Sequence, residues 1–161
     1  MPRSNSISNS ARPSPDEPWV SGRGHHPSVE RARSTPAQRL GDDGERLATA
    51  RLEALGWRIL ARNLRLGRAE VDILAVDPAD RPTLVVVEVR RRGRRDFGLP
   101  EETLDRRKRA ALRHAAGEVA MRAALPDGTG LPPLPVRVDL IAIDSGPDGR
   151  LSVRHHRGIE L

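Results

Sequence analysis

The stretch LVVVEV, from Leu84 to Val89, decides the fold, because it is a run of apolar, mostly β-branched residues broken by a single acid. β-Branched residues favour strands, and an apolar run without polar alternation is typical of a strand buried on both faces. We therefore predict a central strand here. Glu88 needs a partner within it, because a carboxylate buried without an ion pair, a hydrogen bond or a metal is strongly destabilising.

The segments around this strand alternate between strand and helix signals. An apolar stripe at helical spacing runs from Leu47 to Leu55. Asp42 or Asp43 is suited to cap this helix, and Gly56 is suited to end it. Further strands are predicted at residues 57–64, 69–76, 136–143 and, more briefly, 151–154, with a basic loop over 90–97 and a long helix from Pro100 to about residue 123.

This order, α-β-β-β-α-β with a short final β, predicts an α/β fold. Three consecutive strands joined by short turns indicate an antiparallel meander, and a strand that follows a long helix returns to the same sheet. We expect a mixed sheet flanked by helices. Residues 1–40 are rich in Ser, Pro and Arg without apolar periodicity, so they are predicted to be a disordered extension, and residues 41–161 to be one domain.

Composition narrows the classes of function. The chain has 28 basic and 22 acidic residues and a net charge of +6, which suits a polyanionic partner such as nucleic acid. It has no cysteine, which excludes disulfides, thiolate zinc sites and cysteine catalysis. No apolar run reaches the ~20 residues that span a bilayer, and no secretory signal is evident. We expect a soluble cytoplasmic protein.

Three acids are candidates for chemistry. Glu45 lies in the first predicted helix, while Asp72 and Glu88 interrupt apolar strands. Oxygen ligands of this kind suit Mg²⁺, which serves phosphodiester hydrolysis when it bridges acids and phosphate. The alternative is structural, since Glu88 could instead form a salt bridge with Arg62 or Arg65 on a neighbouring strand.

The chain also resembles a known family, YraN, whose uncharacterised bacterial members have the restriction-endonuclease-like PD-(D/E)xK fold. Seven segments follow the family pattern in order and cover nearly all of the predicted domain. The matching segments are Gly44-Glu45, Gly56–Asn63 (GWRILARN), Ala69–Ala75 (AEVDILA), Val86–Arg90 (VVEVR), Gly98–Glu102 (GLPEE), Lys108 and Val138–Ala142 (VDLIA).

The resemblance implies a Mg²⁺-dependent, structure-selective DNA endonuclease similar to archaeal Holliday junction resolvases. Mn²⁺ could replace Mg²⁺, and a homodimer is possible. Carried over by motif, the metal ligands would be Asp72, Glu88, the backbone carbonyl of Val89, and Glu45. Glu70 would support these ligands without binding the metal itself.

The chain departs from the family pattern at the lysine of the ExK motif, which is Arg90 here. Arginine can hold a phosphate, but it does not release a proton near neutral pH and cannot act as a general base. Lys108, the only lysine, could supply the amine from the second helix, or it could be an ordinary exposed charge. If neither residue serves, the fold would bind nucleic acid without cutting it.

Arginine-rich segments adjoin this motif. Arg91, Arg92, Arg94 and Arg95 follow the strand, and Arg106 and Arg109 lie in the following helix. All six are candidates for nucleic-acid contact, which their place beside the acids favours over the alternative of a solvated basic surface. Asp139 also lies in an apolar strand and matches a family aspartate; it could support the metal ligands or be purely structural. The remaining hypothesis is a protein-interaction domain unrelated to nucleic acid.

Overall fold

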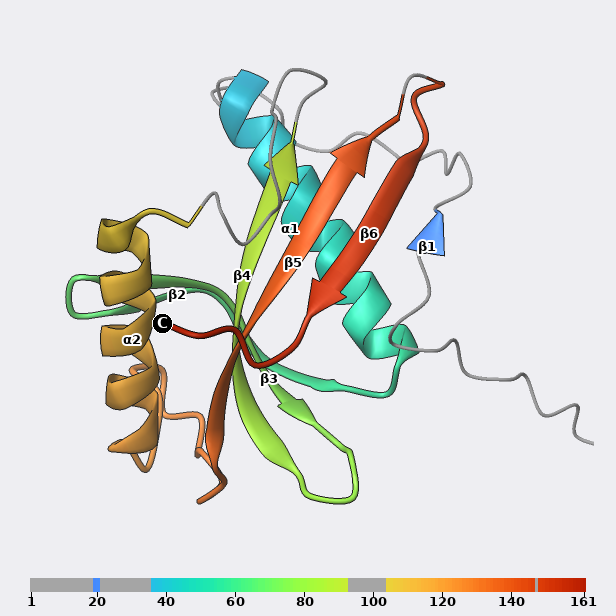
Figure 1. Ribbon diagram of the computed structural model, residues 1–161. Helices are drawn as coiled ribbons and strands as arrows, with labels where there is room; N and C mark the ends of the chain where they lie inside the picture. The colour runs from blue at the N-terminus through green and yellow to red at the C-terminus, as the bar shows by residue number, and fades with distance from the viewer. Residues whose placement is uncertain (1–18, 21–35, 93–103, 147) are drawn as a thin grey trace, which may run out of the picture.

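The computed structural model describes residues 19–20, 36–92, 104–146 and 148–161. Figure 1 shows one mixed sheet with a long helix on each face. In chain order the elements are β1 (Trp19–Val20), α1 (Pro36–Ala54), β2 (Arg58–Leu66), β3 (Ala69–Asp77), β4 (Thr83–Arg92), α2 (Arg106–Ala120), β5 (Val136–Ser145) and β6 (Leu151–His156).

The strands lie in the order β1-β6-β5-β4-β3-β2. β2, β3 and β4 form an antiparallel meander, β5 returns parallel to β4, and β6 is antiparallel to β5. The predicted α/β class and element order are confirmed. The two-residue β1, which pairs with β6, was not expected from the sequence.

The sheet separates two apolar clusters, and this is why the central strands carry so little polar alternation. On one face α1 packs Ala48 and Leu52 against the sheet, and on the other α2 packs Leu112, Ala115 and Val119. Along β4, odd-numbered residues face α1 and even-numbered residues face α2, since successive side chains of a strand alternate. Glu88 is therefore on the α2 side.

The first helix differs from the prediction at its start. α1 begins at Pro36, so Asp42 and Asp43 lie inside it and do not cap it. Its end is as predicted: Gly56 has φ 84°, a left-handed conformation that glycine adopts without strain. Most of the extension predicted at residues 1–40 lies outside the described residues.

The segment between β4 and α2 also differs. Residues 90–92, predicted to open a basic loop, continue β4 instead. α2 begins at Arg106, where the carboxylate of Asp105 accepts a hydrogen bond from the Lys108 amide at 2.7 Å. Pro100 falls outside the described residues, but the predicted helix is wrong at residues 104 and 105, which precede α2 and are not helical. In the described part of the chain, neither helix has the length and apolar character to cross a membrane.

Candidate active site

The site begins where β3 and β4 part. Their backbone pairing runs from Asp77↔Thr83 to Ile73↔Val87. At the next residue of β3, a side chain replaces the backbone as the acceptor: Oδ2 of Asp72 accepts a hydrogen bond from the Val89 amide at 2.7 Å. The continuing register would set Asp72 opposite Glu88. The strand acids are therefore brought together by a local opening of the sheet.

Glu88 is almost fully buried, with 2% of its side chain exposed, and two cations contact it. Lys108 Nζ lies 2.6 Å from Glu88 Oε2, and Arg90 Nε lies 3.2 Å from Oε1. The salt bridge considered from the sequence is thus real, but its partners are not Arg62 or Arg65. Lys108, from α2, reaches the carboxylate of the ExK strand and is not simply an exposed charge.

Electrostatics couple the three acids. Burial, and then repulsion from Asp72, raise the pKa of Glu88 to about 7, against the opposing effects of Lys108 and Arg90. Burial and repulsion from Asp72 also raise the pKa of Glu45. Asp72 thus lies within electrostatic range of an acid from α1 and of an acid from β4. The negative charge of this cluster is only partly compensated by the protein.

Asn63 ends the GWRILARN segment, and no role at the site was predicted for it from the sequence. It has φ 48°, and it is the non-glycine residue in the described part of the chain with positive φ. Its side chain forms a hydrogen bond with Glu45 that lowers the pKa of that acid, partly offsetting burial. Backbone strain of this kind often accompanies functional sites. The Arg-Asn pair at the end of the strand motif was the available signal.

A divalent cation fits this cluster in part. Glu45 Oε2 is buried and has no hydrogen-bond partner among the described residues. Burial first, and then the negative charge of Asp72, disfavour the ionised forms of Glu45 and Glu88, and a bound cation would favour those forms. However, no three acid or histidine side chains of the described residues lie close enough to hold a metal together. Mg²⁺ commonly uses one or two carboxylates and completes its shell with water, so Asp72 and Glu88 form an adequate donor set.

Glu70, expected to stand behind the metal ligands, lies elsewhere. It is exposed and pairs with Arg65 at 3.7 Å. It also lines a pocket of about 340 Å³ beside Arg90 and Lys108. Its described contacts are with this pocket and with Arg65, and its expected role remains a prediction.

The candidate nucleic-acid residues are dispersed. Arg91 points to the α1 face, where its Cβ would lie 3.5 Å from a Cβ added at Gly44. Arg106 is exposed at the start of α2. Arg109 donates to the carbonyls of Leu104 and Glu160, so its guanidinium holds backbone segments. The side chains of Arg92, Arg94 and Arg95 lie outside the described residues.

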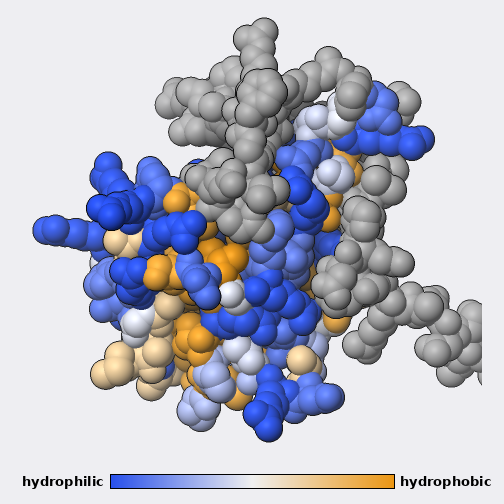
Figure 2. All heavy atoms as spheres, in the orientation of Figure 1, coloured by the Kyte–Doolittle hydropathy of each residue, from blue (hydrophilic) through white to orange (hydrophobic). Residues whose placement is uncertain are grey.

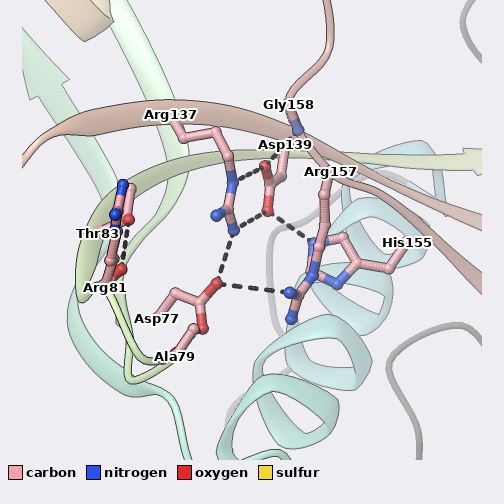
Figure 3. A network of polar contacts seen from close by, with 9 residues as sticks. All are labelled: Asp77, Ala79, Arg81, Thr83, Arg137, Asp139, His155, Arg157 and Gly158. Carbon is pink, nitrogen blue, oxygen red and sulfur yellow. Dashed lines mark hydrogen bonds and ion pairs between the residues drawn. The ribbon is translucent and has the colours of Figure 1, made fainter.

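A second polar cluster lies on the α1 face of the sheet and explains Asp139 (Figure 3). Asp139 accepts two hydrogen bonds from Arg137, at 2.8 and 3.0 Å, and one from the Gly158 amide at 2.9 Å. His155 Nε2 lies 2.9 Å from Asp139 Oδ2. Arg137 also donates a hydrogen bond to the Asp77 carboxylate at 2.9 Å.

This second cluster is structural in its contacts. Burial would raise the pKa of Asp139, but the hydrogen bonds from His155 and Arg137 outweigh it, and the pKa lies below its usual range. Arg137 and Arg157 also stack over the Trp57 ring, with 5.7 and 5.4 Å from guanidinium to centroid. The cluster ties together β3, β5, β6 and the residues that follow β6. Arg137 and Asp139 share one strand face, and that spacing was the signal in the sequence.

Comparison with known proteins identifies relatives of this chain. A UPF0102 protein of Symbiobacterium thermophilum is 37% identical over 118 residues, covering 73% of this chain and 92% of the relative. A UPF0102 protein of Parafrankia is 37% identical over 122 residues, covering 76% and 96%. The solved structure of Pyrococcus furiosus SfsA in complex with Ca²⁺ covers 78% of this chain and 65% of its own, with 16% identity and a TM-score of 0.35, too low to establish a shared fold.

The family model described as "Uncharacterised protein family UPF0102" matches residues 44–143. The match begins at Gly44, beside the α1 acid of the site, and ends at Ile143 in β5. It therefore includes Asp72, Glu88 and Lys108. The chain belongs to the UPF0102 family, which is the YraN family indicated by its sequence motifs.

Proposed function

We propose that this protein is a metal-dependent phosphodiesterase that cuts DNA, with selectivity for branched structures as in the junction resolvases that its family resembles. The observation that carries the proposal is the contact of Lys108 Nζ with the buried carboxylate of Glu88, beside Asp72. An acid pair can hold the metal ion that assists phosphodiester hydrolysis, and an adjoining amine can stabilise the charge that develops on the phosphate.

Each residue has a distinct task in this proposal. Asp72 and Glu88 would hold Mg²⁺ or Mn²⁺, with the Val89 carbonyl and, through water, Glu45 as further oxygen donors. The bound ion would supply Lewis-acid charge at the phosphoryl oxygen. Lys108 would orient the attacking water and stabilise the developing negative charge. The guanidinium of Arg90 would hold the phosphate through paired hydrogen bonds.

The position of Lys108 supports the proposal despite the replacement of the usual ExK lysine. Arg90 cannot act as a general base, because arginine keeps its proton near neutral pH. An amine arriving from α2 at 2.6 Å from the same carboxylate provides the group that β4 lacks. We infer that the catalytic lysine of this chain is on the helix.

A DNA-binding protein without nuclease activity is the second candidate. It is favoured by Arg90, which contacts Glu88 at 3.2 Å and leaves the ExK strand without an amine. In that case Lys108 would only neutralise a buried acid. The two candidates differ in a single measurable property, cleavage.

The deciding experiment is incubation of a labelled four-way junction, a flap and a plain duplex with Mg²⁺ or Mn²⁺. We would compare the wild type with Glu88→Ala, Lys108→Met and Arg90→Lys. Glu118→Ala is the matched control, since Glu118 is an α2 acid that forms an ion pair with Arg122. We expect metal-dependent cleavage, abolished by Glu88→Ala and Lys108→Met and kept by the control.

Other results would redirect the interpretation. Cleavage by Arg90→Lys alone would mark a nuclease that has lost its activity and still binds DNA. Undiminished cleavage by Lys108→Met would refute the helix amine. Absence of cleavage by every protein, with no affinity for DNA at low salt, would refute both candidates.

A further inference from the structure

A small basic pocket adjoins the candidate active site. Its volume is about 340 Å³, and it lies between the β2–β3 turn, the end of β4 and the first turns of α2. Figure 2 shows strongly hydrophilic residues gathered over the first turns of α2 and this turn. The lining residues are Arg68, Glu70, Arg90, Asp105, Arg107, Lys108 and Ala111.

Most of the charged groups that line this pocket already have partners. Lys108 and Arg90 both contact Glu88. Asp105 caps the helix by accepting a hydrogen bond from the Lys108 amide, and Glu70 forms an ion pair with Arg65. Neither acid therefore forms an ion pair with Arg68 or Arg107.

Two cations remain. Arg68, in the turn between β2 and β3, and Arg107, in the first turn of α2, have no ion pair or side-chain hydrogen bond within the described part of the chain. Both are exposed and both line the same pocket. With Glu88 counted, four cations face three acids here, so Arg68 and Arg107 leave this region with a net positive charge that favours anions.

The chemistry of the lining suits a phosphate group. A guanidinium offers parallel N–H donors that match two phosphate oxygens, and two of them from separate elements can hold one phosphate from two directions. The volume is at the small end of ligand pockets, which suits a phosphate with its sugar and is far too small for a duplex. Arg90 and Lys108 link this pocket to Glu88 directly.

We propose that Arg68 and Arg107 bind a phosphate group of a nucleic-acid strand next to the phosphate that is cut at Glu88. This subsite rests on the proposed function for its position along the strand. It would fix the register of the strand and would not read base identity, since phosphate contacts carry no direct sequence information.

Binding without metal tests the subsite separately from cleavage. We would measure the affinity for a short labelled single-stranded DNA by fluorescence anisotropy in EDTA across a salt series. The test protein is Arg68→Gln/Arg107→Gln. The matched control is Arg58→Gln/Arg81→Gln, which removes the same charge from exposed arginines at the opposite end of β3.

The salt dependence gives a quantitative expectation. Losing one single-strand phosphate contact makes the slope of log affinity against log salt shallower by about 0.7. We expect this change, with a weaker affinity at low salt, in the test protein and not in the control. Equal affinities and slopes in the two proteins would overturn the subsite.

Two DNA strands, with and without a 5′-phosphate, separate the sources of the phosphate. A loss confined to the phosphorylated strand would assign the pocket to a strand end, and an equal loss for both would assign it to an internal phosphate. Cleavage is scored separately. If the wild type cuts DNA and the pocket variant binds like the control, only the subsite fails. If affinity falls in the variant and the wild type never cuts, the subsite stands without the nuclease.

Discussion

At the scale of single residues, Glu88 links function to stability. Its raised pKa means that the folded protein keeps this proton over a range, from about 4.5 to about 7, in which the unfolded chain releases it. The folded state binds more protons there, so the free energy of unfolding falls as pH rises through the window. An acid held in this way destabilises the protein at neutral pH.

Glu88→Gln should therefore stabilise the metal-free protein at high pH. The gain in free energy of unfolding over wild type should be small near pH ~5 and approach about 3 kcal/mol near pH ~8. Urea unfolding in EDTA at both pH values measures it. A gain that does not grow with pH would show that Glu88 ionises normally in the folded state.

Asn63 permits the backbone conformation and the side-chain contact to be tested separately. Asn63→Gly should fold with nearly wild-type stability, because glycine tolerates φ 48°, whereas Asn63→Ala should lose about 1 kcal/mol through the left-handed strain. Both variants lose the amide that holds Glu45, so cleavage should fall equally in both. Thermal unfolding and the junction assay measure these effects, and full activity in either variant would contradict a positioning role for Asn63.

The importance of a single residue could be predicted where the residues next to it in the sequence made it stand out. Asp72 and Glu88 stood out because acids interrupt apolar strands, and Lys108 because it is the only lysine. The hydrogen bond of Asn63 to Glu45 was not foreseeable, since it needs a left-handed residue and a partner from another element. The partners of Glu88 were missed for the same reason: contacts across elements are set by packing.

At the scale of elements, α2 carries the amine and its orientation depends on its first turn. The Asp105 side chain accepts a hydrogen bond from the Lys108 amide at 2.7 Å, and loss of such a cap typically lowers stability by about 1 kcal/mol. Asp105→Ala should lose that stability and reduce cleavage, because the turn that positions Lys108 then frays. Asp105→Asn keeps the cap and is the control. Amide hydrogen exchange in α2 and the junction assay provide the measurement, and unchanged exchange in the alanine variant would contradict it.

The polar cluster around Asp139 holds β5 to its neighbours. Asp139→Asn leaves Arg137 short of a buried partner and should destabilise the protein by about 3 kcal/mol. Because its pKa is lowered, Asp139 contributes stability above its unfolded pKa, and this is lost as pH falls through the folded pKa. Asp148→Asn, at an exposed ion pair with Arg150, should change stability by less than ~1 kcal/mol. Equal effects in urea unfolding would refute the role of this cluster.

Element types were predictable where apolar periodicity is strong, and element ends were less so. Gly56 ended α1 as expected, because a left-handed glycine is a local signal. α1 started earlier and β4 ran further than expected, since residues 36–41 and the arginines after Val89 carry no apolar pattern of their own. Pairing with β5 up to Arg92 extends β4, and a contact between distant segments leaves no trace in a local window.

At the scale of the whole molecule, the two faces of the sheet carry different polar groups. The α2 side carries Glu88, Lys108 and the pocket, and the α1 side carries the buried cluster around Asp139. The sheet thus carries a destabilising buried acid on one face, on β4, and stabilising ion pairs on the other, on β5. Both depend on β4 and β5 lying side by side.

Metal binding should appear as global stabilisation. A ligand that binds only the folded state at about 100 times its Kd adds about 2.7 kcal/mol. We expect Mg²⁺ or Mn²⁺ to raise the Tm of the wild type and to leave Glu88→Gln almost unchanged. Differential scanning fluorimetry with Ca²⁺ and Na⁺ as ionic controls measures it. An identical rise in both proteins would place the metal away from Glu88.

The parallel pairing of β4 with β5 has a consequence for the order in which the site is assembled. The β2–β4 meander is local in sequence, whereas Leu84 meets Val136 only after the chain containing α2 has closed a long loop. Parallel pairing between segments so distant in sequence is slow compared with the formation of a local meander. Asp72 and Glu88 can therefore meet during folding before Lys108 arrives. In that early meander Arg90, from the same strand, is the cation beside Glu88, and we expect docking of α2 to add the second cation, Lys108.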